Sequence, residues 1–140
     1  MTVHFCDAIA FLPLTYSAIT DVKRRVIPNS AVLVICACAI AKTLFRGQTL
    51  RDLLFGGLGM SAFLILVTVI AKCDIGGGDI KLCVALGFLF GLLDAIGIFV
   101  VALTLMLMHG VMLKEKAMPF APYVLISVLA YEIYLFLCKE

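Results

Sequence analysis

Two aspartates carry the potential chemistry of a sequence that is otherwise mostly apolar. Asp21 precedes an Ile-Pro-Asn triplet at positions 27–29, and Asp79 directly follows three glycines. An acidic side chain at the edge of a lipid-embedded helix is energetically expensive, which makes it a candidate functional residue. Two neighbouring carboxyl groups share a proton, so one acts as a base on water while the other acts as an acid. We therefore predict that Asp21 and Asp79 are a catalytic pair for peptide hydrolysis.

The residues around Asp79 suggest how a substrate reaches it. Gly76, Gly77 and Gly78 have no side chains, so the chain can turn sharply there and a substrate backbone can approach closely. An extended substrate could pair with this segment by strand addition. Lys81 is a further candidate for positioning the substrate. A nucleotide-binding role for this lysine is disfavoured because the G-x-x-x-x-G-K-[ST] pattern is absent.

The composition indicates a membrane protein. The chain has 140 residues, of which 64% are hydrophobic and 14% charged, whereas a soluble domain carries about 25% charged residues. This length suits one domain, so residues 1–140 are predicted to form a single membrane-embedded peptidase domain. The net charge of +2 is too small to indicate nucleic-acid binding.

Apolar segments predict an all-α, polytopic membrane protein with about six transmembrane helices. The second segment spans the membrane if Lys42 extends to the interface. The fourth segment has about 14 residues and a length of roughly 21 Å, which is short of the ~30 Å hydrocarbon core. We therefore expect a Gly-rich loop that dips into the membrane before it and holds Asp79 below the surface. The six segments cover residues 3–20, 31–45, 53–71, 80–93, 95–113 and 120–137.

Basic residues predict the orientation of these segments. The side that contains both aspartates is predicted to be cytoplasmic because it has more basic residues, which places both termini outside. The cluster at positions 23–25 is interpreted as a topology anchor that contacts lipid headgroups. The cytoplasmic side carries Lys23, Arg24, Arg25, Lys72, Lys81, Lys114 and Lys116, and the opposite side carries Lys42, Arg46, Arg51 and Lys139.

A proline pair precedes the last apolar segment on the same predicted side. Pro119 and Pro122 end the preceding helix and suit the first turn of the next one. Because this side also holds both aspartates, the two prolines are additional candidates for contact with the substrate. His109, near the end of the fifth segment, is interpreted as a packed or interfacial histidine rather than a proton shuttle.

Other polar residues give no second reaction centre. The six cysteines include no C-x-x-C pair, so neither a zinc site nor any other cofactor is predicted. Cys73 lies beside the second motif but has no histidine near it in sequence, which disfavours a nucleophilic role. Asp74 is interpreted as a loop acid or a polar neighbour of the predicted pair.

The order and spacing of three motifs closely resemble those of the type IV prepilin peptidase family, which are GxGD-type membrane aspartyl proteases. The motifs are Asp21 with the triplet at 27–29, the glycines with Asp79, and the Pro-Phe-Ala-Pro run at 119–122. The resemblance covers nearly the whole chain and implies that Asp21 and Asp79 are catalytic. It implies prepilin or pseudopilin substrates, or preflagellin-like ones, whose short basic leader is cut at the cytoplasmic face.

Larger members of that family carry an N-terminal insert with paired C-x-x-C motifs and also methylate the new N-terminus. This sequence has no such insert, so we expect the short form without methyltransferase activity. The expected partners are these substrates and membrane lipids, and the expected location is a bacterial or archaeal cytoplasmic membrane.

Two alternatives from other functional classes remain open. Buried acids also serve as proton relays in small ion-coupled transporters, although no inverted repeat is apparent here. An inactive subunit of a pilus or secretion assembly is the other alternative. Taken alone, Asp21 could also be an interfacial residue that counters Lys23 or Arg24.

Overall fold

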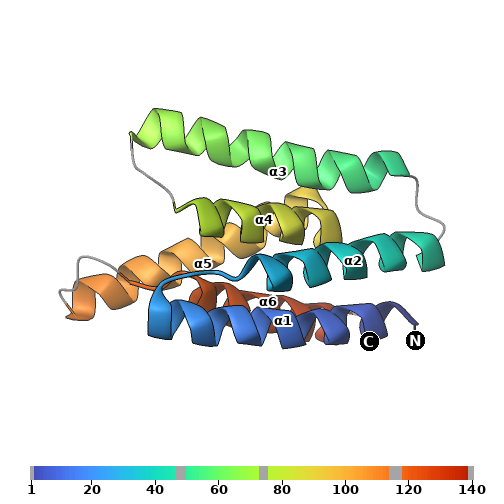
Figure 1. The fold of residues 1–140 in the computed structure, drawn as a ribbon, viewed down its shortest axis with the longest axis horizontal. Helices are drawn as coiled ribbons and strands as arrows, with labels where there is room; N and C mark the ends of the chain where they lie inside the picture. The colour runs from blue at the N-terminus through green and yellow to red at the C-terminus, as the bar shows by residue number, and fades with distance from the viewer. Residues whose placement is uncertain (1, 47–49, 73–75, 114–117, 139–140) are drawn as a thin grey trace.

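Six helices make up the part of the chain that the computed structural model describes, residues 2–46, 50–72, 76–113 and 118–138 (Figure 1). No strand occurs within these ranges, so the all-α prediction is confirmed. The helices are α1 (Thr2–Arg24), α2 (Asn29–Arg46), α3 (Leu50–Ala71), α4 (Gly77–Phe90), α5 (Leu92–Leu113) and α6 (Ala121–Leu137).

The helices alternate in direction along the bundle. The starts of α2, α4 and α6 lie at the same end of the molecule as the ends of α1, α3 and α5 (Figure 1). Asp21 is in the last turn of α1 and Asp79 is in the first turn of α4. Both aspartates therefore lie at one end of the bundle, as their segments predicted.

Helix α4 is short and central, and it packs against α2, α3 and α5. Its 14 residues give a length of about 21 Å, too short to cross a ~30 Å hydrocarbon core. The boundaries differ from the predicted ones. Gly77 and Gly78 form the first helical turn rather than a loop, because Ile80 N–H donates to the Gly76 carbonyl at 3.1 Å. The helix ends before Gly91, whose φ of 92° breaks it.

Glycines allow α3 and α4 to approach each other closely. A Cβ atom on Gly87 would lie 2.6 Å from the Gly56 carbonyl oxygen and 2.8 Å from Met60 Cβ. A Cβ atom on Gly57 would overlap the Phe88 ring. Small residues at such crossings are typical of membrane helix pairs. This contact holds α4 in the centre of the bundle.

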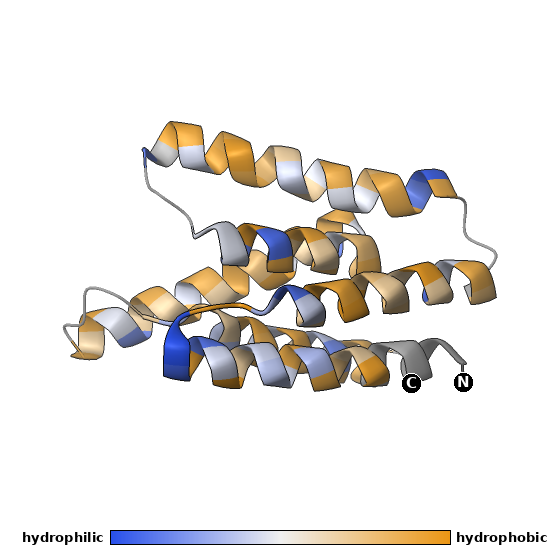
Figure 2. Ribbon diagram, in the orientation of Figure 1, coloured by the Kyte–Doolittle hydropathy of each residue, from blue (hydrophilic) through white to orange (hydrophobic). Residues whose placement is uncertain are grey.

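Apolar residues predominate along the helices (Figure 2), and many large apolar side chains are exposed, as expected for a polytopic membrane protein. Leu93, Val111 and Met112 are each at least 79% exposed. A soluble protein rarely exposes such extensive apolar surface. Among the described residues, Leu50–Ile70 and Leu92–Leu113 are long and apolar enough to cross a membrane, and shorter apolar helices cover Asn29–Phe45 and Ala121–Leu137.

Lys42, whose extension to the interface was the condition for the second segment to span the membrane, does not extend outward from α2. Its side chain is 7% exposed, and the ammonium group lies 5.0 Å from the centroid of the Phe90 ring. A cation over an aromatic face is attracted by the negative charge of that face. The Lys42 side chain therefore lies inside the bundle rather than at its surface.

Candidate active site

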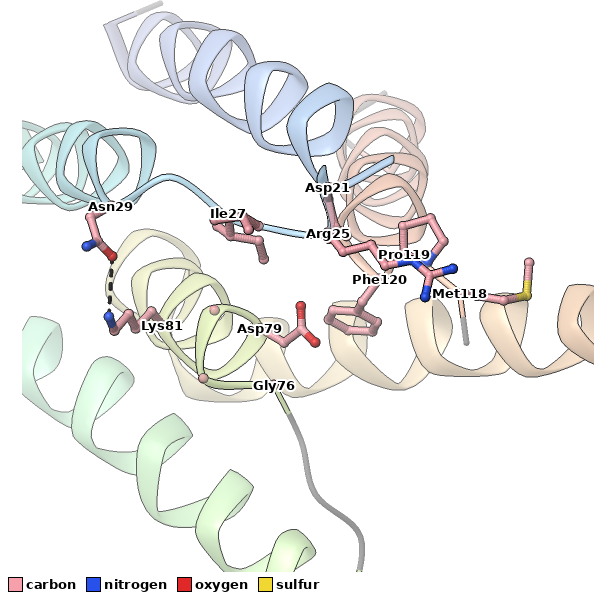
Figure 3. A pocket seen from close by; sticks show the side chains of 13 residues that line it. Asp21, Arg25, Ile27, Asn29, Gly76, Asp79, Lys81, Met118, Pro119 and Phe120 are labelled. Atoms are coloured by element: carbon pink, nitrogen blue, oxygen red, sulfur yellow. Dashed lines mark hydrogen bonds between the residues drawn. The ribbon is translucent and has the colours of Figure 1, made fainter. Parts of the chain in front are cut away.

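A cavity of about 460 Å³ opens at the end of the bundle where both aspartates lie (Figure 3). Three chain segments form it: the end of α1 with the following connection, the start of α4, and the connection into α6. Its lining residues are Asp21, Arg25, Val26, Ile27, Asn29, Gly76, Gly77, Gly78, Asp79, Lys81, Met118, Pro119 and Phe120.

Asp21 is held by the first residue of α6. Its side chain is 6% exposed, and its Oδ2 atom accepts a hydrogen bond of 2.9 Å from the backbone N–H of Ala121. The first N–H groups of a helix have no partner within the helix. The N-cap residue Phe120 supplies no side-chain acceptor, so Asp21 caps α6 from another helix.

Helix α4 positions Asp79 in the same cavity. Asp79 is half-buried, and it lies close enough to Asp21 for their carboxyl groups to interact electrostatically. An acidic side chain in the first turn also interacts favourably with the positive end of the helix dipole. The fold therefore brings the predicted pair together from helices that are distant in sequence.

The three glycines before Asp79 differ in the space around them. A Cβ atom on Gly76 would lie 3.1 Å from Asp79 Oδ2, and one on Gly78 would lie 3.2 Å from Ile27 Cβ. A Cβ atom on Gly77 would meet nothing within 4 Å. Gly76 and Gly78 thus permit close packing around Asp79, whereas Gly77 faces open space.

The structure places most of the remaining candidate residues at the cavity. Lys81 lines it, and its Nζ atom donates a hydrogen bond of 3.3 Å to Asn29 Oδ1, which links the starts of α4 and α2. Pro119 also lines the cavity. Pro122 lies outside the lining, in the first turn of α6, where proline is favoured because it lacks the N–H that a helix start leaves unpaired.

Sequence reasoning missed several cavity residues, above all Arg25. The basic cluster at 23–25 was interpreted as an anchor at the membrane surface. All three residues are exposed, but only Arg25 lines the cavity. Val26, Ile27, Asn29, Met118 and Phe120 were also missed as lining residues. These residues lie in or next to the motifs in the sequence, which is the one signal that could have identified them. The sequence does not show where their side chains point.

His109 is not among the residues that line the cavity. Its Nδ1 atom shares a hydrogen bond with the Tyr123 hydroxyl, and the two rings are 5.9 Å apart. This contact joins the end of α5 to the start of α6, although His109 itself is exposed. The interpretation of His109 as a packed or interfacial histidine stays a prediction. Cys73 and Asp74 lie outside the described residues. No group of ligands suited to a metal ion occurs among the residues that are described.

The arrangement has the parts required for acid–base chemistry on a peptide bond. Two carboxyl groups at one site can divide the roles of general base and general acid between them. The apolar residues Ile27 and Phe120 and the cationic residues Arg25 and Lys81 surround the pair, so the site can distinguish substrates by shape and charge.

Comparison with known protein families assigns most of the chain to one family. The sequence profile of the Type IV leader peptidase family matches residues 8–138. The chain therefore belongs to this family, as the resemblance of its three motifs predicted.

One relative has a stated activity. The chain is 29% identical to the prepilin leader peptidase/N-methyltransferase of Bacillus subtilis (strain 168). The similarity covers 94% of this chain and 57% of the relative, so the chain spans little more than half of the relative's length. No solved structure matches this chain.

Proposed function

We propose that this protein is a membrane aspartyl endopeptidase that removes the short basic leader of prepilin-like or preflagellin-like proteins. The observation that carries this proposal is the presence of Asp21 and Asp79 in one cavity, within a chain of the Type IV leader peptidase family. The stated activity of the Bacillus subtilis relative supports the same substrate class.

In the proposed reaction, a water molecule between the two carboxyl groups attacks the scissile carbonyl. One aspartate takes a proton from this water as its oxygen bonds to the carbonyl carbon, and the other protonates the carbonyl oxygen. A proton then passes to the amide nitrogen as the C–N bond breaks, which releases the leader with a new carboxyl terminus and the remaining protein with a new amino terminus. The bond from Ala121 N–H fixes the orientation of the Asp21 carboxyl group. Gly76 and Gly78 leave space for close packing around Asp79, and the open cavity lets an extended substrate backbone reach it.

We propose a location in a bacterial or archaeal cytoplasmic membrane, with the cavity facing the cytoplasm and both termini outside. The excess of Lys and Arg residues at the cavity side supports this orientation. A substrate whose hydrophobic helix lies in the bilayer would then present its leader to the cavity from the cytoplasm. Labelling of single cysteines from each side of the membrane tests the orientation.

The experiment that tests the activity uses the purified protein in lipid with a peptide that joins a prepilin leader to its hydrophobic helix. Asp21→Asn and Asp79→Asn are each expected to abolish cleavage. Asparagine retains an oxygen that can accept the Ala121 hydrogen bond, so Asp21→Asn tests the acid rather than the cap of α6. Asp94→Asn is the matched control, because Asp94 is exposed and lies outside the cavity lining.

Three outcomes separate the functional classes. Loss of cleavage in both site variants, but not in Asp94→Asn, supports the proposed peptidase. Full cleavage by either site variant contradicts the assignment of the pair. Proton flux across vesicles without any cleavage would instead indicate the ion-coupled transporter.

A further inference from the structure

Arg25 has an unfavourable backbone conformation directly beside the proposed catalytic pair. It follows the last residue of α1 with a φ of 52°, and its N–H donates to the Asp21 carbonyl at 2.8 Å. Glycine is the usual residue in this left-handed position at a helix end, because a side chain is strained there. The chain nevertheless places an arginine, a large cationic residue, at this point.

Lys72 provides an internal comparison. It follows α3 in the same left-handed conformation, with a φ of 49°, and its side chain is exposed. A cation interacts favourably with the negative end of a helix dipole, which accounts for a basic residue at both helix ends. The dipole alone does not explain why Arg25 lines the cavity, because Lys72 lies at the same kind of helix end and does not line it.

The Arg25 side chain defines one side of the cavity. Figure 3 shows it extending past Pro119 toward Met118, away from the side that holds Lys81 and Asn29. Asp79 lies between these two sides. A polypeptide that crosses the cavity to reach Asp79 therefore passes Arg25 on one side of the scissile bond.

The chemistry of the guanidinium group indicates what it binds there. Its planar set of N–H donors matches the two oxygens of a carboxylate, and it repels a lysine or arginine side chain. We propose that Arg25 is a specificity-determining residue that binds an acidic side chain of the substrate close to the scissile bond. This inference rests on the proposed peptidase function. A lipid headgroup phosphate is the competing anion for Arg25. If Arg25 binds a headgroup instead, the Arg25 side chain gives cleavage no dependence on the substrate sequence.

The test compares peptide substrates that differ only in charge. Glu, Gln and Lys are placed in turn at each of the positions flanking the cleaved bond, and kcat/KM is measured for every peptide. At one or more positions, the wild-type enzyme is expected to prefer Glu over Lys by about five- to tenfold, the size expected for a partly exposed ion pair. Arg25→Glu is expected to reverse this preference at the same positions, and Arg25→Gln to remove it.

Lys72→Glu is the matched control, because it makes the same change of charge at the same kind of helix end, outside the cavity. It is expected to leave the Glu-to-Lys ratio unchanged. The inference is overturned if Arg25→Gln and Arg25→Glu keep the wild-type ratio at every position, or if Lys72→Glu changes it equally. If the wild-type enzyme cleaves none of the peptides, the proposed function itself fails. A purely structural role for Arg25 would alter cleavage of all the peptides by the same factor.

Discussion

The carboxylate of Asp21 caps helix α6 through the backbone N–H of Ala121, 2.9 Å away, although 100 positions separate the two residues. This bond joins the first and last helices of the bundle at the cavity. It also gives the Pro-Phe-Ala-Pro run a structural purpose. Pro122 has no N–H to be capped, and Phe120 provides no side-chain cap for the start of α6. The N–H of Ala121 is capped instead by the proposed catalytic acid, Asp21.

Removal of this N–H should weaken catalysis more than substrate binding. Replacement of Ala121 by lactic acid converts the amide into an ester and deletes the donor without adding atoms. Because hydrogen bonds to charged groups are the stronger ones, we expect kcat to fall about ten- to a hundredfold, with little change in KM. Steady-state kinetics on a leader peptide provide the measurement.

The control for this experiment is the same ester substitution at Ala31. Ala31 is also buried near a helix start, but its N–H donates locally to the Pro28 carbonyl at 3.1 Å. The Ala31 ester should retain the wild-type kcat. An equal loss of kcat at both positions would mean that the bond to Asp21 has no special role in the reaction.

The glycines before Asp79 should differ in their tolerance of a methyl group. In Gly76→Ala the new Cβ atom lies 3.1 Å from Asp79 Oδ2, so the carboxyl group must shift. Small displacements of reacting groups are costly, and we expect kcat to fall about three- to tenfold. Gly77→Ala should cause a smaller loss, because nothing lies within 4 Å of its new Cβ atom. Equal losses in kcat would contradict this reading of the glycines.

The contact between α3 and α4 should govern the stability of the bundle. Gly87→Ala places a Cβ atom 2.6 Å from the Gly56 carbonyl oxygen, and such overpacking typically costs about 1–3 kcal/mol. The midpoint of thermal unfolding in detergent should therefore fall. In Gly97→Ala, by contrast, the Cβ atom meets nothing within 4 Å, and the midpoint should stay the same or rise slightly. A similar decrease in both variants would exclude the α3–α4 contact as the cause.

The hydrogen bond between Lys81 and Asn29 should appear as an energetic coupling. Its 3.3 Å length and exposed setting suggest a coupling of about 0.5–1 kcal/mol in the free energy of unfolding. A double-mutant cycle of Lys81→Ala and Asn29→Ala provides the measurement. Additive effects on the unfolding free energy would show that the two side chains act independently.

Much of the fold was predictable because long apolar runs and their breaks carry strong local information. All six helices, including the short fourth one, were expected from the sequence. The start of α4 was missed because Gly77 and Gly78 resemble a loop, although the Gly76 carbonyl accepts a helical hydrogen bond there. Gly91, which ends α4 in a left-handed conformation, lies inside an apolar run that has no other break.

The sequence by itself determined the chemical identity of the site: two aspartates, three glycines and a proline pair in motifs that define a family. Only the tertiary structure decided which neighbours surround them. The Ala121 donor is a backbone group, so no side chain marks it, and the left-handed conformation of Arg25 after α1 is not one that an arginine indicates. Contacts between residues 100 positions apart follow from how helices pack, which local sequence patterns do not encode.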